Sequence, residues 1–134
     1  MTKERLKKYI ALKKERDQLK ARLEEVNAQL YSIRTSELTG MPKAHDVPND
    51  VAEKLIDKKT KLANRYNFVL LRLEDELLKI ETAIEAVEDA TARSLLRLRY
   101  IDGLTWEEVC VHINYGWTQT HKLHAKALRL IENK

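Results

Sequence analysis

Four side chains that could bind a metal ion lie close together near the C-terminal end of this 134-residue chain. They fall within fifteen residues of one another and are Cys110, His112, His121 and His124. No pair among them has a spacing typical of a zinc site, and a mid-helix cysteine suits a small core residue. We therefore expect no metal and no cofactor. Because Cys110 is the only cysteine, no disulfide can form within the chain.

Catalytic chemistry has little support in the sequence. There is no Gly-rich phosphate loop and no convincing pairing of a nucleophile with a base. The acidic residues Glu74, Asp75 and Glu76 are consecutive, so they lie on different faces of one predicted helix and cannot converge on a metal ion. We expect that the chain is not an enzyme.

A different chemistry is found between residues 117 and 129, where hydrogen-bond donors, cations and one aromatic occur with almost no acid. The candidate DNA-contacting residues are Trp117, Thr118, Gln119, His121, Lys122, Lys126 and Arg129. Gln119 could pair bidentately with adenine, and Lys122 could donate to guanine. Lys126 and Arg129 suit phosphates. His121 or His124 beside a phosphate would make binding sensitive to pH.

Three short helices are predicted to position these side chains. The last runs over 117–132 from an N-cap at Gly116, and its inner face holds Thr120, Leu123, Ala127 and Leu130/Ile131. A helix over 106–113 should begin after Thr105, because Thr105-Trp-Glu-Glu108 matches a capping box. A helix over 90–102 should begin after an N-cap at Asp89 and end at Gly103. Trp106 is expected to face that helix.

The segment TWEEVCVHINYGWTQTHKLHAKALRLI (residues 105–131) resembles the region-4 helix–turn–helix of sigma factors. The segment begins with Thr-x-Glu-Glu-Val and ends in Lys-Ala-Leu-Arg, and both elements align with the motif without a gap. The preceding segment LLRLRYIDGLT (95–105) resembles the residues that lead into that motif. Trp106 and the Asn114-Tyr115 turn look most like small regulators from phages and mobile elements of Gram-positive bacteria, of the ArpU/RinA kind. The resemblance covers about residues 93–132.

The resemblance implies DNA-reading positions at Trp117, Thr118, Gln119, His121 and Lys122. Three departures from the family pattern stand out. Gly116 stands where Ser or Thr usually caps, and Thr120 replaces an apolar residue that normally packs inward. Trp117 and Thr118 replace a charged pair common in sigma factors, so no promoter preference can be carried over. The chain is also too short to hold the other regions of a sigma factor.

Two long helices precede this segment. Residues 3–36 contain no Gly or Pro, and a heptad seam runs through Tyr9, Leu12, Arg16, Leu19, Leu23, Val26, Leu30 and Ile33. A second helix over about 51–88 should begin at an N-cap on Asp50, after a loop of residues 37–50. Its apolar stripe slips by one position between Leu73 and Leu77. We expect an antiparallel hairpin that also mediates dimerisation. A purely structural spacer is the alternative.

The charge distribution divides the chain into basic ends and an acidic middle. Residues 1–36 carry ten Lys/Arg against five Asp/Glu, residues 37–90 carry eight against twelve, and residues 91–134 carry seven against four. Basic segments at both ends of the chain are suited to binding nucleic acid. Opposite charges that pair along a hairpin are the alternative reading. No apolar run is long enough to span a bilayer, and a signal peptide is not expected.

The sequence therefore predicts an all-α protein with a helical hairpin over 1–88 and a helix–turn–helix DNA-binding domain over 89–134. The predicted function is a sequence-specific transcriptional regulator of a phage or mobile element. Its predicted partners are double-stranded DNA, a second copy in a homodimer and RNA polymerase, without a membrane, in the cytoplasm of a bacterial host. The alternative is an adaptor that binds RNA polymerase or a host factor without reading DNA.

Overall fold

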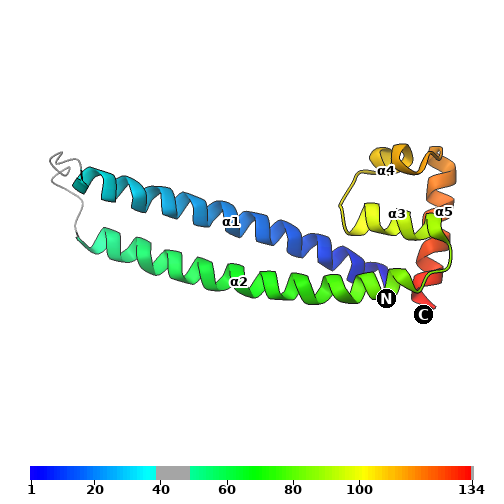
Figure 1. The fold of residues 1–134 in the computed structure, drawn as a ribbon, viewed down its shortest axis with the longest axis horizontal. Helices are drawn as coiled ribbons and strands as arrows, with labels where there is room; N and C mark the ends of the chain where they lie inside the picture. Colours follow the sequence, from blue (N-terminus) through cyan, green and yellow to red (C-terminus); the bar gives the residue numbers. More distant parts are fainter. Residues whose placement is uncertain (39–48, 134) are drawn as a thin grey trace. The chain divides into compact units, whose positions relative to one another are not determined.

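In a computed structural model, the chain is all-α (Figure 1). The structure describes residues 1–38 and 49–133, and these hold five helices and no strand. The helices are α1 (Lys3–Leu38), α2 (Asn49–Glu85), α3 (Ala90–Tyr100), α4 (Trp106–Ile113) and α5 (Trp117–Glu132). Residues 39–48 of the predicted loop over 37–50 lie outside the described residues. No described helix is long and apolar enough to cross a membrane.

The heptad seam of α1 is its packed face, as predicted. Leu19 and Val26 are buried, while Leu12, Leu23 and Leu30 are half-buried. Arg16, the polar member of the seam, is also half-buried and forms an ion pair with Asp17 at 2.9 Å. A stripe at this spacing needs a partner helix, because isolated helices with one apolar face are marginal in water.

The predicted bounds of α2 were wrong at both ends. The helix begins at Asn49, so Asp50 is not its N-cap but lies in the first turn, where it pairs with Lys54 at 3.4 Å. It ends at Glu85 rather than near residue 88, and buried Val87 lies beyond the helix. At the slip in the apolar stripe, Leu77 and Glu76 are both half-buried. Both positions of the stutter therefore contribute to packing.

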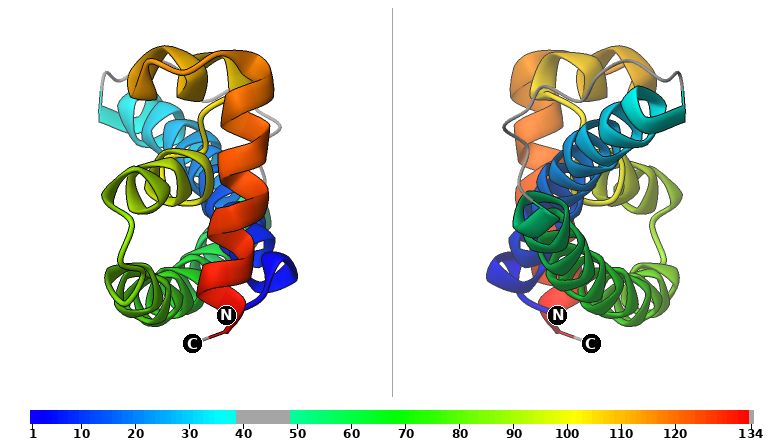
Figure 2. Two further views of the ribbon diagram at one scale, coloured as in Figure 1. Left: turned by 90° about the vertical axis from the view of Figure 1, so that its right-hand side faces the viewer. Right: turned by 90° about the vertical axis from the view of Figure 1, so that its left-hand side faces the viewer.

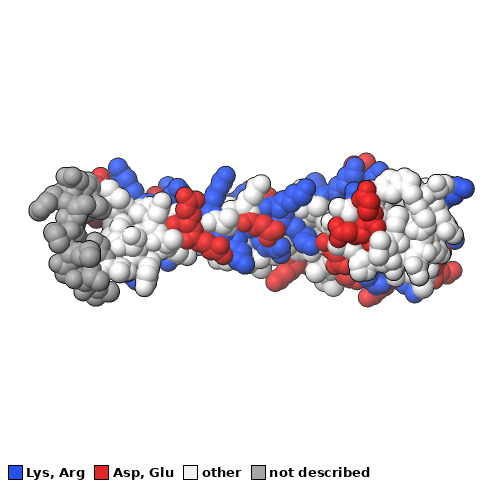
Figure 3. Space-filling view, turned by 90° about the horizontal axis from the view of Figure 1, so that it is seen from above, with Lys and Arg blue, Asp and Glu red and all other residues white. Residues whose placement is uncertain are grey.

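Charged residues on the long helices pair with their own neighbours. Lysines lie four residues after aspartates in the pairs Asp50–Lys54, Asp57–Lys61 and Asp75–Lys79, with N–O distances of 2.9–3.4 Å. Figure 3 shows Lys and Arg side chains interspersed with Asp and Glu on the face drawn. Exposed pairs of this kind are each worth only a few tenths of a kcal/mol. They keep the outer faces solvated and add little to stability.

The chain forms two compact units. The central unit is residues 14–71, where segments of α1 and α2 are joined by the ion pair of Glu15 with Arg65 at 2.9 Å. The terminal unit is residues 1–13 and 72–134, which includes α3, α4 and α5. The predicted domain boundary at residues 88/89 falls inside the terminal unit and stays a prediction.

Within the terminal unit, α3, α4 and α5 pack on one another. Their shared core is mainly apolar, and its fully enclosed apolar side chains are Ala92, Leu95, Leu96, Val109, Ala127 and Ile131, with the polar Thr120 enclosed among them. Two flanking elements are tied to this group by polar contacts. Lys13 of α1 donates to the carbonyl of Ile101 at 2.6 Å. Arg97 of α3 pairs with Glu81 of α2 at 3.4 Å.

Candidate nucleic-acid interface

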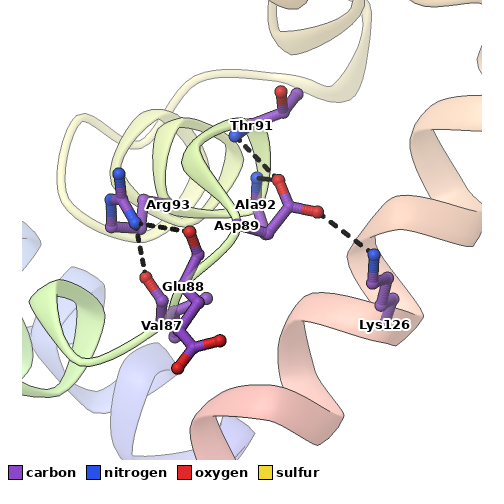
Figure 4. A network of polar contacts seen from close by, with 7 residues as sticks. All are labelled: Val87, Glu88, Asp89, Thr91, Ala92, Arg93 and Lys126. Atoms are coloured by element: carbon purple, nitrogen blue, oxygen red, sulfur yellow. Dashed lines mark hydrogen bonds and ion pairs between the residues drawn. The ribbon is translucent and has the colours of Figure 1, made fainter.

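The start of α3 is fixed by a polar network (Figure 4). The Asp89 carboxylate is the predicted N-cap, because it accepts hydrogen bonds from the N–H groups of Thr91 and Ala92 at 2.9 and 3.2 Å. Its second oxygen accepts from the Lys126 ammonium of α5 at 3.1 Å. The backbone bond to Ala92 and the contact with Lys126 hold the pKa of Asp89 below its usual value. One carboxylate thus joins two helices.

The start of α4 follows the prediction, but α3 ends at Tyr100, two residues before the predicted end at residue 102. Gly103 has φ +73°, in the left-handed region that glycine adopts without strain. Thr105 is the N-cap of α4, and its hydroxyl oxygen accepts from the Glu108 N–H at 3.3 Å. The Glu108 carboxylate accepts in turn from the Thr105 hydroxyl at 3.0 Å. Helix α4 therefore starts at Trp106, as its capping sequence predicts.

Three residues connect α4 to α5. Asn114 adopts the left-handed conformation with φ 63°, and its N–H and that of Tyr115 donate to the carbonyls of Val111 and Cys110 at 3.3 and 3.1 Å. These two bonds satisfy carbonyls that the end of a helix leaves free. Gly116 then caps α5 with an extended backbone and no side-chain hydrogen bond. The first turn of α5 consequently carries no capping side chain over it.

The inner face of α5 contains two polar residues, Thr120 and His124. From the sequence, Thr120 was identified as a departure from the sigma-factor pattern and His124 as a possible ligand. Thr120 is fully buried, and its hydroxyl lies 3.2 Å from the thiol of Cys110 in α4. The polar residue that replaces an apolar one in the sigma pattern is thus accommodated by a neighbouring S–H donor. Cys110 contacts Thr120 and lies in no cluster of metal ligands. In the described parts of the chain, no group of three or more His, Cys, Asp or Glu residues is arranged to hold a metal ion.

His124 is a core residue. Its side chain is 9% exposed, and its Nε2 lies 2.7 Å from the Tyr100 hydroxyl. Burial first, and then the nearby charges of Lys3, His121 and Arg99, lower the pKa of His124 to about 4. The ring is therefore neutral near pH 7. It is directed at Tyr100 inside the unit, so it does not act on a bound phosphate.

A column of aromatic rings runs from this core to the start of α5. Trp106 contacts the rings of His124 and His121, with centroid separations of 4.6 and 4.7 Å. His121 in turn meets Trp117 edge-on at 4.5 Å. The guanidinium of Arg99 lies over the Trp106 ring at 4.5 Å, so Trp106 faces α3 as predicted. The column gives Trp117 a fixed base.

The predicted DNA-contacting residues divide into three groups by their surroundings. Trp117, Thr118, Gln119, Lys122 and Arg129 are exposed, and Trp117 retains 54% of its accessible surface. Lys126 is exposed as well, but its ammonium is held by Asp89. His121 is half-buried between two tryptophans, and its Nε2 is enclosed without a hydrogen-bond partner. The structure thus brings four exposed side chains together on the first two turns of α5.

Two contributors to this region were not identified from the sequence. Arg99 supports Trp106 from across the Gly103 turn, and its Nη1 also donates to the Leu104 carbonyl at 2.8 Å. Lys13 of α1 donates a hydrogen bond to the carbonyl of Ile101 at the end of α3, although the two residues are 88 positions apart in the sequence. No local spacing marks either residue. The sequence offered one signal for Arg99, which is that it is a basic residue in the last turn of a helix.

Comparison with known proteins places the chain in a family. A family model described as "Protein of unknown function (DUF1492)" matches residues 39–132, which is more than half of the chain. The chain therefore belongs to the DUF1492 family. No curated protein and no solved structure matches the chain significantly.

Proposed function

We propose that this DUF1492 protein is a sequence-specific DNA-binding transcriptional regulator of a phage or mobile genetic element, and that α5 reads the major groove. One observation carries the proposal. The first two turns of α5 expose Trp117, Thr118, Gln119 and Lys122 without an acidic residue, directly after a three-residue turn from α4. A recognition helix places its N-terminal side chains against base edges in this way.

The arrangement of α3, α4 and α5 supports a helix–turn–helix of the sigma region-4 kind. Such motifs join two packed helices through a turn of about three or four residues that often contains Gly. Here the turn is Asn114-Tyr115-Gly116, and buried Thr120, His124 and Ala127 hold α5 against its neighbours. The outer face of α5 is consequently free to enter a groove. Arg129, and Lys126 if it exchanges Asp89 for DNA, would bind phosphates.

The two long helices would serve as an antiparallel hairpin and a dimerisation element. In the terminal unit Arg5 pairs with Glu76, and in the central unit Glu15 pairs with Arg65. Residue numbers rise on α1 as they fall on α2, which is the order of an antiparallel pair. On α2, Phe68 and Leu71 are 52% and 67% exposed and share a helix face. A second copy of the chain would cover this face, and a dimer would present two recognition helices to DNA in the host cytoplasm.

An adaptor that binds RNA polymerase or a host factor is the second candidate. It is favoured by Val111 on α4, which is 78% exposed and follows the exposed acidic residues Glu107 and Glu108. Acidic and apolar side chains on an outer helix face suit a protein partner better than DNA. The two candidates differ in whether the chain selects a DNA sequence.

The test is a selection from randomised duplexes with the full chain, followed by salt titration on the enriched duplex and on a scrambled one. We expect enrichment of a defined sequence, with affinity that falls steeply as salt rises because phosphate contacts release counterions. Trp117→Ala/Lys122→Ala should abolish the preference. The matched control is Tyr31→Ala/Lys61→Ala, which removes an exposed aromatic and an exposed lysine from the central unit. Absence of enrichment, or a preference that survives the α5 substitutions, would favour the adaptor.

A further inference from the structure

The first turns of α1 carry positive charge that the proposed recognition helix does not account for. Residues 1–13 contain one acidic residue, Glu4, against the basic residues Lys3, Arg5, Lys7, Lys8 and Lys13. Two of the basic residues have structural partners. Arg5 pairs with Glu76 at 3.8 Å, and Lys13 donates to a carbonyl at the end of α3. The remaining three lysines are Lys3, Lys7 and Lys8.

This part of α1 is firmly held within the terminal unit. Leu6 is fully buried and Tyr9 is 6% exposed. A Cβ at Gly103 would lie 3.6 Å from the Cδ1 atom of Ile10, which places this turn of α1 in contact with the α3–α4 connection. Because Lys13 also anchors the next turn to the Ile101 carbonyl at the end of α3, the backbone that carries the lysines of α1 is held in place within the terminal unit. A fixed position is what a charge needs to bind a phosphate in register.

The start of α1 lies next to α5 (Figure 2), and Lys3 and Lys7 share one face of this part of α1. Figure 2 shows the beginning of α1 beside the C-terminal half of α5. Lys3 is close enough to His124 of α5 for its charge to help lower the pKa of that ring. Lys7 follows one turn later on the same flank, because residues four apart share a helix face. Arg5 lies on the other flank, toward Glu76 of α2.

Neither Lys3 nor Lys7 forms an ion pair with any residue that the structure describes, and Lys7 is exposed. We propose that Lys3 and Lys7 bind the DNA phosphate backbone beside the groove that α5 enters, as a second contact built on the N-terminal end of the chain. This inference rests on the proposed function. From Trp117 to Arg129, α5 is about 18 Å long at 1.5 Å per residue. The major groove is about 12 Å wide, so the C-terminal half of α5 and the adjacent α1 reach its border.

The experiment compares the salt dependence of binding for three full-length proteins on the duplex enriched by selection and on its scrambled version. They are the unaltered chain, Lys3→Ala/Lys7→Ala, and a control, Lys54→Ala/Lys58→Ala, which removes two exposed lysines with the same spacing from α2. Each phosphate contact contributes about 0.9 to the slope of log K against log salt. The α1 variant should therefore lose a little under 2 from the slope. Its affinity should fall by a similar factor on both duplexes, while the preferred sequence stays the same.

The outcomes separate this inference from the proposed function. An unchanged slope in the α1 variant, with sequence-selective binding that still depends on Trp117 and Lys122, would overturn the α1 contact alone. An equal loss of slope in the control would overturn it too, because the effect would then be general charge. A changed sequence preference would mean that these lysines do not act through phosphates. If the unaltered chain shows no selective binding, the proposed function fails and the α1 contact fails with it.

Discussion

The hydroxyl of Tyr100 and the Nε2 atom of His124 lie 2.7 Å apart in the interior of the terminal unit, and this contact joins α3 to α5. Burial raises the pKa of Tyr100, so its hydroxyl keeps its proton. Burial also lowers the pKa of His124 to about 4, so the ring stays neutral at physiological pH. A hydroxyl donor and a neutral imidazole acceptor therefore satisfy each other behind the proposed recognition helix. Protonation of the ring would remove that acceptor.

We expect stability to fall as pH decreases from about 6.5 to about 4. The ordinary pKa of histidine in the unfolded chain is 6.5, and the folded value is about 4. Within that window the unfolded state binds more protons, so the contribution of His124 is complete above pH 6.5 and is lost toward the folded pKa. The loss is at most about 3 kcal/mol, since one pKa unit corresponds to about 1.4 kcal/mol. Urea unfolding at several pH values measures it.

The control for this pH dependence is His124→Gln, which keeps a hydrogen-bonding side chain but does not titrate. The free energy of unfolding of this variant should depend less on pH between about 4 and 6.5 than that of the unaltered chain. Carboxylates such as Asp89 titrate in both proteins, so their effect cancels in the difference. Parallel pH curves for the two proteins would show that His124 is not the responsible group.

Substitution of the two described glycines of the terminal unit should change the stability of the protein in opposite directions. Gly103→Ala should destabilise by about 1 kcal/mol, because φ +73° disfavours any side chain, although a Cβ there makes only an ordinary 3.6 Å contact. Gly116→Ser should stabilise by a few tenths of a kcal/mol, because its φ of −70° suits serine and nothing lies within 4 Å of a new Cβ. Thermal unfolding of both variants distinguishes the cases. A stabilised Gly103→Ala would contradict the left-handed turn.

Asp89 has two separable roles, and two substitutions distinguish them. Asp89→Asn keeps an N-cap acceptor but loses the charge that pairs with Lys126, so its Tm should fall less than that of Asp89→Ala, which loses both. Lys126→Ala should match Asp89→Asn. Differential scanning calorimetry at neutral pH gives the order. Because the folded pKa of Asp89 is lowered, the loss of Tm of each variant relative to the unaltered chain should shrink as pH falls through that pKa, where the Asp89 carboxylate of the unaltered chain becomes protonated.

The proposed dimer can be tested on the central unit. Phe68→Ser/Leu71→Ser removes two apolar side chains that are already 52% and 67% exposed, so stability of a monomer should change by less than about 1 kcal/mol. The same change should raise the dissociation constant of a dimer that buries this face, since apolar burial drives association. Sedimentation equilibrium measures the constant. A mass equal to one chain for the unaltered protein at all concentrations would rule out the dimer.

Local signals in the sequence predicted the short helices better than the long ones. Asp89, Thr105 and Gly116 are the N-caps of the three short helices, as predicted, and the bounds of α4 and α5 agree with the prediction. Gly103 adopts the predicted left-handed conformation, although α3 already ends at Tyr100. The start of α2 was missed because Asp50 and Glu53 match a cap that the folded chain does not use. A capping pattern is a short match, and a helix start can lie one residue away at little cost.

Apart from the packing of Trp106 toward α3, the side-chain contacts between helices were not predicted from the sequence. His124 was considered as a phosphate or metal ligand, because its spacing does not reveal that Tyr100 lies opposite it. The aromatic column and the Lys126–Asp89 bond depend on how α5 crosses α3 and α4, which periodicity does not specify. The spacing did correctly separate the buried face of α5, with Thr120 and Ala127, from its exposed face, with Gln119 and Lys122.

The exposed face of α5 leads to the most specific prediction. Lys122 follows Trp117 and Thr118 by about one turn, and it is exposed. If it donates to a guanine, Lys122→Ala should weaken binding to the selected duplex by about 1–3 kcal/mol and relax the preference at one base position. If it binds a phosphate instead, affinity should fall on every duplex and the salt slope should decrease by about 0.9, with the preference unchanged.

Fluorescence anisotropy on single-base variants of the selected duplex separates these two roles of Lys122. The matched control is Lys58→Ala, which removes an exposed lysine from α2 in the central unit. Its substitution should leave the sequence preference and the salt slope unchanged. Unchanged affinity and unchanged preference in Lys122→Ala would remove this residue from the interface. The reading of bases would then rest on Gln119 and Trp117, which the same duplex variants would test.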